Sequence, residues 1–578
     1  MPPHNIAEKR RPTVKKLIAI VLILGLAAAG PNHAVAQQLP ADVLGQQGMV
    51  VAVSPDAADI GAATLRRGGN AVDAAIATAF AMSVTWPQAG NIGGGGFMMI
   101  HPGNGADPVC IDYRETAPAA ATRTTFSLDS SRFGCRIVGV PGTVHGLETA
   151  HRAYGKLPWK SLVEPAVRLA RDGFVIGKPL ADSFNGILAS EATKPFAEFQ
   201  RVFGPTGREK WQPGDRLVQP DLAATLSRIA ASGSRGFYTG KTAQLIVDEM
   251  ERGEGLITAD DLAAYRAKIR KPIHTTFRGY DVYGPPPPSS GGITLALMLN
   301  TLENFELKKL GRWSPETAHL LAETMRRAYL DRARHLGDAD FVEIPAHLTT
   351  KAYAKRLASE IDRNRATPSV ELAKDIPIAP GGNSTTHFSV VDASGMAVSN
   401  TYTLEFSYGS RVVVQGGGFL LNNEMGDFNW VPGHTDREGR IGTKANQIEP
   451  GKRMLSSQTP TIVAKEGRAL LVTGSPGGRT IINTVLCVVL NVLEFDMSLP
   501  NAVASRRMHH QWLPDQVRLE GQGAAPIDEI VKNLKNRGHA VREGISVQGD
   551  AHSILVDLKT GEIHGVADGR RDGKASGY

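Results

Sequence analysis

Thr385 and a distant glycine pair are the residues of this chain best suited to amide chemistry. The segment Thr385-Thr386-His387 opens an alternating strand, and cutting the Ser384–Thr385 bond would give Thr385 a free α-amine beside its hydroxyl. An α-amine has a reference pKa of about 7.7–8.0, so it can accept a proton near neutral pH without a histidine. Gly477 and Gly478 offer backbone N–H groups to an oxyanion. These residues predict an amidase that first cuts its own chain.

The elements around Thr385 must aim its hydroxyl. The pattern predicts strands over 386–391 and 396–401, joined by a turn at 392–395. Because side chains alternate along a strand, two sets lie on opposite faces. One set is Thr385, His387 and Ser389, and the other is Thr386, Phe388 and Val390.

Other elements follow from local patterns. A strand at Val50 precedes a predicted helix over 56–67, and Asn70 can cap a second helix over 71–83. The glycines at 93–96 enter an apolar strand rather than a helix, which favours close backbone packing over dinucleotide binding. Helical patterns dominate from 142 to 266 and again over 292–302, after a proline turn at 285–288. Residues 364–384 have the composition of a mobile linker.

Composition indicates a globular enzyme. The chain has 578 residues, of which 42% are hydrophobic and 21% charged. Of the net charge of +7, the first 36 residues carry +4, which leaves +3 on the rest. This balance gives no reason to expect a nucleic-acid partner.

The first 36 residues have the pattern of a secretory signal peptide. Basic residues precede an apolar run over 17–29, and Ala34-Val35-Ala36 forms a cleavage site. The run is shorter than the roughly 20 residues of a membrane-spanning helix. We expect cleavage after Ala36, no stable membrane span, and a periplasmic or secreted bacterial protein.

Three cysteines and several histidines give no metal signature. Cys487 lies in an apolar helical pattern, and no Cys/His ligand spacing occurs. Cys110 and Cys135 could pair in an oxidising compartment, and the sequence leaves that open. His509 and His510 are adjacent and cannot both face one metal from a regular element, so packing or surface roles are expected.

Seven short motifs, in this order and spacing, resemble those of the γ-glutamyltranspeptidases, which are also called glutathione hydrolases. The resemblance runs from about Gly48 to Tyr578. The motifs are 69–75 (GNAVDAA), 87–90 (PQAG), 112–115 (DYRE), 385–387 (TTH), 421–423 (LNN), 455–457 (LSS) and 473–478 (TGSPGG).

The resemblance implies an α+β fold, the four-layer αββα sandwich of the N-terminal nucleophile hydrolases. It implies a large segment 37–384 and a small segment 385–578, both from one precursor and sharing one core. Thr385 would be the nucleophile, Thr403 would orient it, and Gly477 and Gly478 would form the oxyanion hole. The family needs no cofactor or metal.

The resemblance also implies a site for a γ-glutamyl group, whose α-amino acid head carries both charges. Arg114 matches the arginine that binds the carboxylate, with Ser456 and Ser457 as hydroxyl partners. Asp427 matches the aspartate that binds the ammonium, assisted by two neighbouring carboxylates. These are Glu405 and Glu424, at positions where many relatives carry Asn and Gln.

The implied reaction is γ-glutamyl transfer from glutathione or related compounds to water, an amino acid or a short peptide. A β-lactam side-chain (glutaryl) acylase on the same scaffold and an exported, uncleaved binding protein remain alternatives. The loop over 432–443 has the length of the family's lid, but Glu438 stands where relatives often place an aromatic gate. The sequence does not indicate the physiological donor, the acceptor or the oligomeric state.

Overall fold

The structure is a computed structural model of the full chain, and it describes residues 39–578 apart from 374–378, 381–384, 438, 522–526 and 546. The predicted signal peptide, Ser384 and Glu438 therefore lie outside the described residues. In the described part, no helix is long and apolar enough to cross a membrane.

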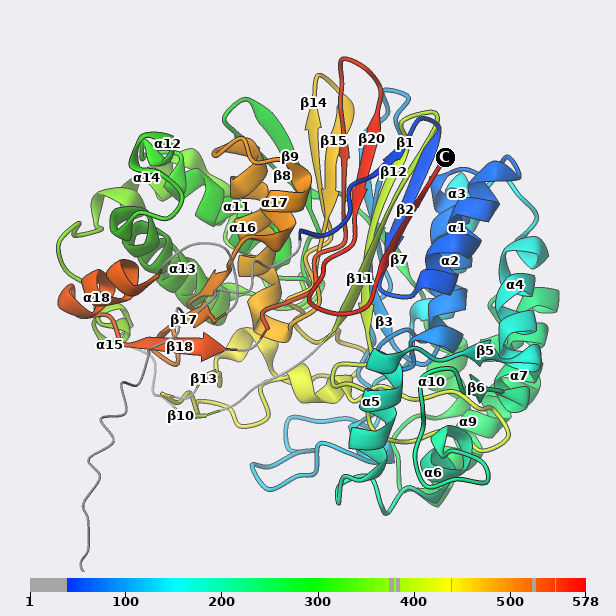
Figure 1. The fold of residues 1–578 in the computed structure, drawn as a ribbon. Helices are drawn as coiled ribbons and strands as arrows, with labels where there is room; N and C mark the ends of the chain where they lie inside the picture. Colours follow the sequence, from blue (N-terminus) through cyan, green and yellow to red (C-terminus); the bar gives the residue numbers. More distant parts are fainter. Residues whose placement is uncertain (1–38, 374–378, 381–384, 438, 522–526, 546) are drawn as a thin grey trace, which may run out of the picture. The chain divides into compact units, whose positions relative to one another are not determined.

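Two seven-stranded antiparallel sheets form the centre of the fold (Figure 1). We call the sheet that contains the Thr385 strand sheet I. In order, its strands are β21 (Lys574–Gly577), β2 (Gly48–Ala52), β11 (Thr386–Asp392), β12 (Ala397–Thr403), β3 (Gly95–His101), β4 (Val109–Asp112) and β7 (Lys268–Arg270).

The second sheet, sheet II, packs face to face with sheet I. In order, its strands are β1 (Val43–Gly45), β20 (Ile563–Val566), β19 (Ser553–Val556), β15 (Arg468–Thr473), β14 (Thr461–Lys465), β9 (Tyr280–Gly284) and β8 (Ile273–Phe277). Because side chains alternate along a strand, each apolar strand contributes to two cores, one between the sheets and one under the helices. In β2, Met49 and Val51 face sheet II, whereas Val50 and Ala52 pack against helices.

Helices cover the outer face of sheet I (Figure 1). This layer begins with α1 (Pro55–Arg66) and α2 (Ala71–Thr85), which lie on the strands, followed by α3 (Thr143–Tyr154). Further helices pack outside these: α4 (Trp159–Asp172), α5 (Lys178–Leu188), α6 (Ala197–Phe203), α7 (Pro220–Ser232), α8 (Arg235–Tyr238), α9 (Gly240–Arg252) and α10 (Ala259–Ala264).

A second helical layer covers the outer face of sheet II. Its members are α11 (Gly291–Leu302), α12 (Leu307–Leu310), α13 (Pro315–His335), α14 (Lys351–Ser359), α16 (Ile481–Leu493), α17 (Leu499–Ala504) and α18 (Asp528–Asn536). The four-layer αββα sandwich implied by the resemblance is therefore confirmed. Each sheet contains strands from before and from after Thr385, so the two predicted segments share one core.

The predicted helices beside sheet I are confirmed with small shifts at their ends. Asn70 and Asp73 form a reciprocal capping box at the start of α2, and the helix continues to Thr85. Asp73 also accepts hydrogen bonds from the backbone amides of Lys156 and Leu157, at 3.1 Å. One buried carboxylate thus fixes both the start of α2 and the loop before α4.

The glycine cluster at 93–96 serves close packing, as predicted. A Cβ at Gly94 would lie 2.0 Å from the carbonyl oxygen of Thr403, and one at Gly96 would lie 2.4 Å from that of Thr401. Only glycine lets β3 approach β12 this closely, because any side chain would meet backbone.

The hairpin of β11 and β12 is confirmed, and its two faces separate as predicted. Phe388 and Val390 pack under the helices of sheet I. On the opposite face, Ser389 Oγ donates to the carbonyl oxygen of His552 at 2.9 Å. His387 and Ser389 therefore point toward sheet II, on the face predicted to carry the Thr385 hydroxyl.

The prediction of a mobile linker over 364–384 is wrong for its first half. Residues Ser369–Leu372 form a short helix, α15. Ser369 Oγ donates to the carbonyl oxygen of Trp512 at 2.7 Å, and its amide donates to Asp515 at 2.7 Å. Ala379–Pro380 then forms β10, which pairs with β13 (Gly439–Arg440). Tertiary hydrogen bonds hold a segment that composition alone predicts to be loose.

The three cysteines are free and buried, so the possible Cys110–Cys135 bond does not form in this structure. Cys110 lies between the two sheets, whereas Cys135 donates to the carbonyl oxygen of Glu249 at 3.4 Å. The adjacent histidines are packing residues, as expected. His509 contacts Asn483 at 2.7 Å and His510 contacts Asp515 at 3.2 Å.

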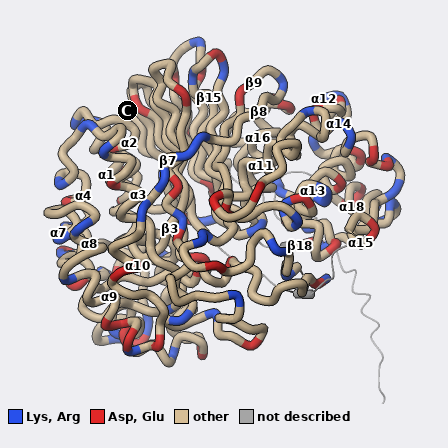
Figure 2. Tube along the Cα trace, turned by 180° about the vertical axis from the view of Figure 1, so that it is seen from behind, with Lys and Arg blue, Asp and Glu red and all other residues tan. Residues whose placement is uncertain are grey.

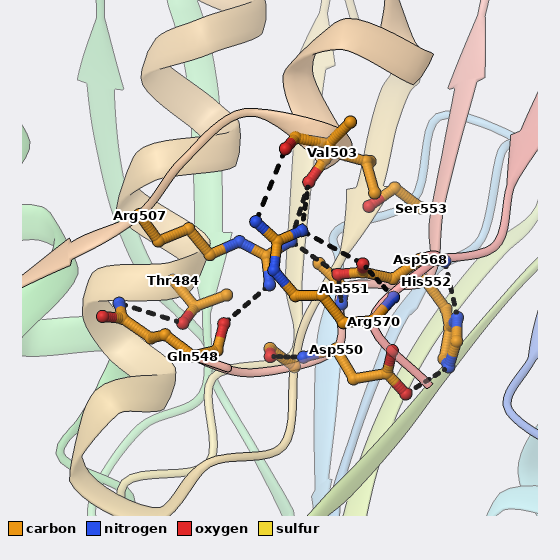
Figure 3. A network of polar contacts seen from close by, with 12 residues as sticks. Thr484, Val503, Arg507, Gln548, Asp550, Ala551, His552, Ser553, Asp568 and Arg570 are labelled. Carbon is orange, nitrogen blue, oxygen red and sulfur yellow. Dashed lines mark hydrogen bonds and ion pairs between the residues drawn. The ribbon is translucent and has the colours of Figure 1, made fainter. Parts of the chain in front are cut away.

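A buried ionic network ties the C-terminal strands to the body of the protein (Figure 3). Arg507 donates to Asp568 at 2.6 Å, and Arg570 lies 3.1 Å from the other oxygen of that carboxylate. Arg507 also donates to the carbonyl oxygen of Gln548 at 2.7 Å, and Asp568 accepts from the amide of Ala551 at 2.7 Å. The network therefore fixes the segment 548–551, which passes behind the glycine loop.

Charges of both signs are scattered over the outer helices and loops (Figure 2). Examples are the exposed pairs of Lys178 with Asp182 and of Arg356 with Glu360. Exposed pairs of this kind contribute little to stability, about 0–1 kcal/mol each.

We expect the Gly474→Ala substitution to destabilise the fold. The added Cβ would lie 2.4 Å from the His387 ring, which is a buried neighbour with little freedom to move. Overpacking of this kind costs about 1–3 kcal/mol. The measurement is the midpoint of denaturant unfolding.

Gly186→Ala is the matched control. Gly186 lies in α5, and no atom lies within 4 Å of its added Cβ, so alanine should stabilise the helix by about 0.5–1 kcal/mol. Equal midpoints for the two variants would contradict the contact between Gly474 and His387.

Candidate active site

Most of the predicted site residues gather around one pocket. The pocket contains about 570 Å³ of empty volume, part of which is open to solvent. The predicted residues that line it are Arg114, Thr385, Thr403, Glu405, Glu424, Asp427, Ser456, Ser457 and Gly478. Gly477 precedes Gly478 and is not among the lining residues, and Ser384 lies outside the described residues.

Strand register places the two predicted catalytic threonines opposite each other. Thr386 pairs with Tyr402 across β11 and β12, and continuing this register by one residue sets Thr385 against Thr403. Both line the pocket, and Thr385 is only 8% exposed. Thr403 Oγ1 accepts a hydrogen bond from the Glu405 amide at 2.8 Å, which fixes the side chain of Thr403.

The predicted oxyanion glycines form a tight turn just before α16. Gly477 has φ 132° and Gly478 has φ 57°, both in the left-handed region that favours glycine. Thr480 closes the turn, because its amide and hydroxyl both donate to the carbonyl oxygen of Gly477, at 3.1 and 2.9 Å. The turn requires glycine for its backbone conformation as well as for access to backbone amides.

Polar contacts between the sheets join the glycine loop to the Thr385 strand. Ser399 Oγ, on β12, donates to the carbonyl oxygen of Thr473 at 2.9 Å. The amide of Asp550 donates to Ser475 Oγ, also at 2.9 Å. The His387 ring lies against Gly474 and contacts Thr401 Oγ1 at 2.8 Å. Burial, and then the nearby His552, lower the pKa of His387 well below its usual range, so this ring acts as a neutral spacer.

Arg114 lies among two buried carboxylates and one half-buried carboxylate on the far wall of the pocket. Its Nη2 is 2.5 Å from Asp427 Oδ2 and 2.7 Å from Glu424 Oε2, and its Nη1 is 3.5 Å from Glu115 Oε2. The structure therefore brings together the predicted carboxylate-binding cation and the predicted ammonium-binding anion. A head group that carries both charges could bridge the two.

Burial leaves the acidic wall short of partners. Among the described residues, one oxygen each of Glu115 and Glu405 and both oxygens of Glu424 have no hydrogen-bond partner, although Glu424 Oε2 forms the ion pair with Arg114. Burial raises the pKa of Glu115 to about 7 and the pKa values of Glu405 and Glu424 well above the usual range, although Arg114 opposes the rise in each case. A ligand with a positive charge would stabilise these buried carboxyl groups, because it would supply the missing partner.

Glu405 is held in a strained backbone conformation. Its φ is 79°, which is uncommon for a residue with a side chain. The bond from its amide to Thr403 and a 2.7 Å bond from Asn423 Nδ2 to Glu405 Oε2 stabilise that conformation. Strain of this kind collects at functional sites.

The predicted serine pair lies against the proline turn. The amide of Ser456 donates to the carbonyl oxygen of Pro288 at 2.9 Å, so the stiff turn at 285–288 supports the pocket wall. Arg332, from α13, donates to Ser457 Oγ at 2.9 Å and to Ser290 Oγ at 2.8 Å. Burial, and then the nearby Arg479, lower the pKa of Arg332 to about 10.

Sequence reasoning missed several lining residues, among them Arg332, Arg479, Asn429 and Asn446. Arg479 directly follows the predicted oxyanion glycines, so its position in the sequence could have identified it as a pocket residue. Arg332 lies in a long polar helix far from every motif, and nothing in its neighbourhood separates it from a surface charge. Asn446 donates to the carbonyl oxygen of Asp427 at 2.7 Å and so holds the acidic turn.

The loop over 432–443 contributes Ile441 and Thr443 to the pocket. Gly433 and Gly442 are joined by a 2.7 Å backbone hydrogen bond, and Thr443 Oγ1 donates to the carbonyl oxygen of Ala333 at 2.5 Å. The base of the loop is therefore attached to α13. Its action as a lid stays a prediction.

Comparison with known proteins agrees with this geometry. The family model for gamma-glutamyltranspeptidase matches residues 57–578. The glutathione hydrolase proenzyme of Escherichia coli (strain K12) is 43% identical over 588 residues, covering 98% of this chain and 100% of that protein. The acylase ACY 1 proenzyme of Pseudomonas sp. (strain V22) is 37% identical, covering 92% of this chain and 93% of that protein.

Two solved structures share the fold. The cephalosporin acylase from Bacillus halodurans has a TM-score of 0.83 at 26% identity, covering 95% of this chain and 99% of that chain. The gamma-glutamyltranspeptidase of Helicobacter pylori has a TM-score of 0.53 at 41% identity, covering 55% of this chain and 93% of that chain. On the strength of the family match and the full-length relatives, this chain belongs to the γ-glutamyltranspeptidase family.

Proposed function

We propose that this protein transfers γ-glutamyl groups from glutathione and related amides, through an ester on Thr385. The Thr385 hydroxyl attacks the γ-carbonyl while the α-amine of Thr385 accepts the proton. The C–N bond then breaks, and the amine leaves with that proton. Water, an amino acid or a short peptide takes the glutamyl group from the ester. The supporting observation is that one pocket holds two sets of residues. Thr385, Thr403 and Gly478 could carry out the reaction, and Arg114, Asp427 and Ser456 could bind the two charges of the glutamyl head.

Maturation by cleavage at Ser384–Thr385 belongs to the same proposal. The uncut bond holds the α-amine of Thr385 in an amide, where it cannot act as a base. The N-terminal pattern favours a periplasmic or secreted site of action, with the two segments remaining in one particle.

A Thr385→Ala variant should remain a single chain and release no glutamate from glutathione. The reason is that one hydroxyl serves both self-cleavage and turnover. Denaturing electrophoresis, N-terminal sequencing of the lighter fragment and assays with and without glycylglycine are the measurements.

Thr386→Ala is the matched control, because Thr386 is the adjacent residue and its side chain points to the opposite face of β11. It should be cut and active. Cleavage of Thr385→Ala, or a lighter fragment that starts at another residue, would refute the assignment. A single uncut band from the unaltered protein would instead favour the binding-protein alternative.

A glutaryl acylase is the second candidate, because the chain resembles both an acylase proenzyme and a cephalosporin acylase structure. A glutaryl group lacks the ammonium. The buried Glu405 and Glu424 and the half-buried Asp427 would then lie beside a ligand without a positive charge. We expect kcat/KM for γ-glutamyl-p-nitroanilide to exceed that for glutaryl-p-nitroanilide by at least about tenfold, the value of one charged hydrogen bond. The reverse preference would establish the acylase.

Binding of L-glutamate as a product inhibitor should tighten as the pH rises through the raised pKa of Glu424. Burial raises the pKa of Glu424, so this group is neutral at low pH and gains the charge that attracts an ammonium as the pH increases. One linked proton changes the inhibition constant by up to about tenfold per pH unit. Glu424→Gln should flatten that dependence.

The exposed Glu466→Gln variant is the control for this measurement. Titration of the Thr385 α-amine affects all three proteins, so the difference between them isolates residue 424. An unchanged pH dependence in Glu424→Gln would show that Glu424 does not face the ammonium.

A further inference from the structure

The positive charge of Arg114 is already offset inside the protein. Its Nη2 lies 2.5 Å from Asp427 Oδ2 and 2.7 Å from Glu424 Oε2. A single ionised carboxylate at such a distance neutralises the guanidinium. A substrate carboxylate at Arg114 must therefore share this cation with a carboxylate of the protein, and Arg114 alone supplies little net attraction.

Arg332 brings a second positive charge to the pocket. It comes from α13, lines the pocket and is only 8% exposed. Its hydrogen bonds go to two hydroxyl groups, those of Ser290 and Ser457, and in the part of the chain that the structure describes it has no ion-pair partner. Arg479, which lines the same pocket, adds to the positive field. A buried cation without an opposite charge is unfavourable, so an anionic ligand would stabilise Arg332.

The contact with Arg332 decides which way the Ser457 hydroxyl faces. Arg332 Nη2 donates to Ser457 Oγ at 2.9 Å, and a guanidinium has no acceptor atom. The Ser457 oxygen must therefore accept, and its hydrogen points away from Arg332. Among the described residues, no acceptor takes that hydrogen. Because Ser457 lines the pocket, its O–H group is available to a ligand.

Ser456 has the same polarity. Its Oγ accepts a hydrogen bond from the amide of Gln458 at 3.1 Å, so its hydrogen is also left for a ligand. Arg332 supports this residue through Ser290: its Nε donates to Ser290 Oγ at 2.8 Å, and Ser290 Oγ donates to the carbonyl oxygen of Ser456 at 2.6 Å. The pocket thus offers two adjacent O–H donors. A carboxylate only accepts and fits this pair, whereas a neutral amide group brings donors of its own.

We propose that Arg332 is a positioning residue for the α-carboxylate of the γ-glutamyl donor and that it acts through the Ser457 hydroxyl. This inference rests on the proposed function and adds the residue that gives the carboxylate end of the pocket its net positive charge. A hydroxyl that accepts from a cation becomes a stronger donor, because hydrogen bonds in series polarise one another. Arg114 and Ser457 then both donate to the carboxylate, and discrimination between a free carboxylate and its amide depends on Arg332.

The test compares two donors that differ only at this group, γ-glutamyl-p-nitroanilide and its α-carboxamide. In the unaltered enzyme, we expect a higher kcat/KM for the free carboxylate. Arg332→Gln should lower the ratio of the two values at least about tenfold, because a charge is lost from a buried site. Arg332→Lys keeps the charge, and its ratio should stay within about threefold of the unaltered ratio.

A double-mutant cycle separates action through Ser457 from a general effect on the fold. In a Ser457→Ala background, Arg332→Gln should change the ratio by less than about threefold, because the hydroxyl that Arg332 orients is absent. A loss as large as in the enzyme that retains Ser457 would overturn the proposed route.

Arg334→Gln is the matched control. Arg334 lies two residues further along α13, donates to the carbonyl oxygen of Leu372 at 3.2 Å and does not line the pocket. Its ratio should equal that of the unaltered enzyme. An equal fall in Arg334→Gln and Arg332→Gln would show a general effect of the helix and overturn the inference.

Denaturing electrophoresis first shows whether each variant is cut. An Arg332→Gln enzyme that is cut and keeps the unaltered ratio would overturn the inference while leaving γ-glutamyl transfer intact. If Arg332→Gln is not cut, Ser457→Ala decides, since it removes the oriented hydroxyl and should itself lower the ratio at least about fivefold. An unchanged ratio in Ser457→Ala would overturn the inference as well. If the unaltered enzyme releases no p-nitroaniline, the proposed function fails and this inference fails with it.

Discussion

The pairing of β11 on both sides is the constraint on which the rest of the site depends. The strand hydrogen-bonds to β2 and to β12, so a chain end created at Thr385 emerges from the middle of a sheet instead of its edge. Free chain ends normally fray, but this one would pair with β12 from Thr386 onward and also with β2 from Phe388 onward. The same register sets Thr403 opposite Thr385. A slip of one residue would turn the hydroxyl toward the helices, because alternate residues face opposite sides.

The buried charges of the pocket carry a cost in the stability of the fold. Arg114 faces Glu115, Glu424 and Asp427, and Glu405 lies nearby in a strained backbone conformation. Buried carboxylates without full partners destabilise a fold, and replacing them with neutral residues often stabilises it. Their retention is understandable when the ligand supplies the missing positive charge. The strain at Glu405 and the raised pKa values of this wall are both consistent with the ammonium site that we propose.

The sequence predicted those elements that short-range patterns of residue types specify. The capping box at Asn70, the glycines that admit β3 beside β12, and the hairpin of β11 and β12 all follow from short-range rules. The resemblance supplied the fold and most pocket residues. The rest depended on long-range contacts. Arg332 reaches Ser457 from a helix without a motif, and the segment after residue 364 is ordered by Trp512 and Asp515. No pattern of neighbouring residue types encodes such contacts.

The C-terminal segment explains how a cut chain can keep the site assembled. Both sheets contain strands from before and after Thr385, with β21 paired to β2 and β20 paired to β1. Separating the segments would therefore break both sheets and expose the core between them. The network of Arg507, Asp568 and Arg570 adds a rigid support behind the glycine loop, since it fixes the backbone at 548–551, which contacts Ser475 (Figure 3). That support and the Thr385 strand both belong to the segment after the proposed cut. Cleavage would therefore free the amine of Thr385 while the Thr385 strand and the glycine loop stay in one continuous segment.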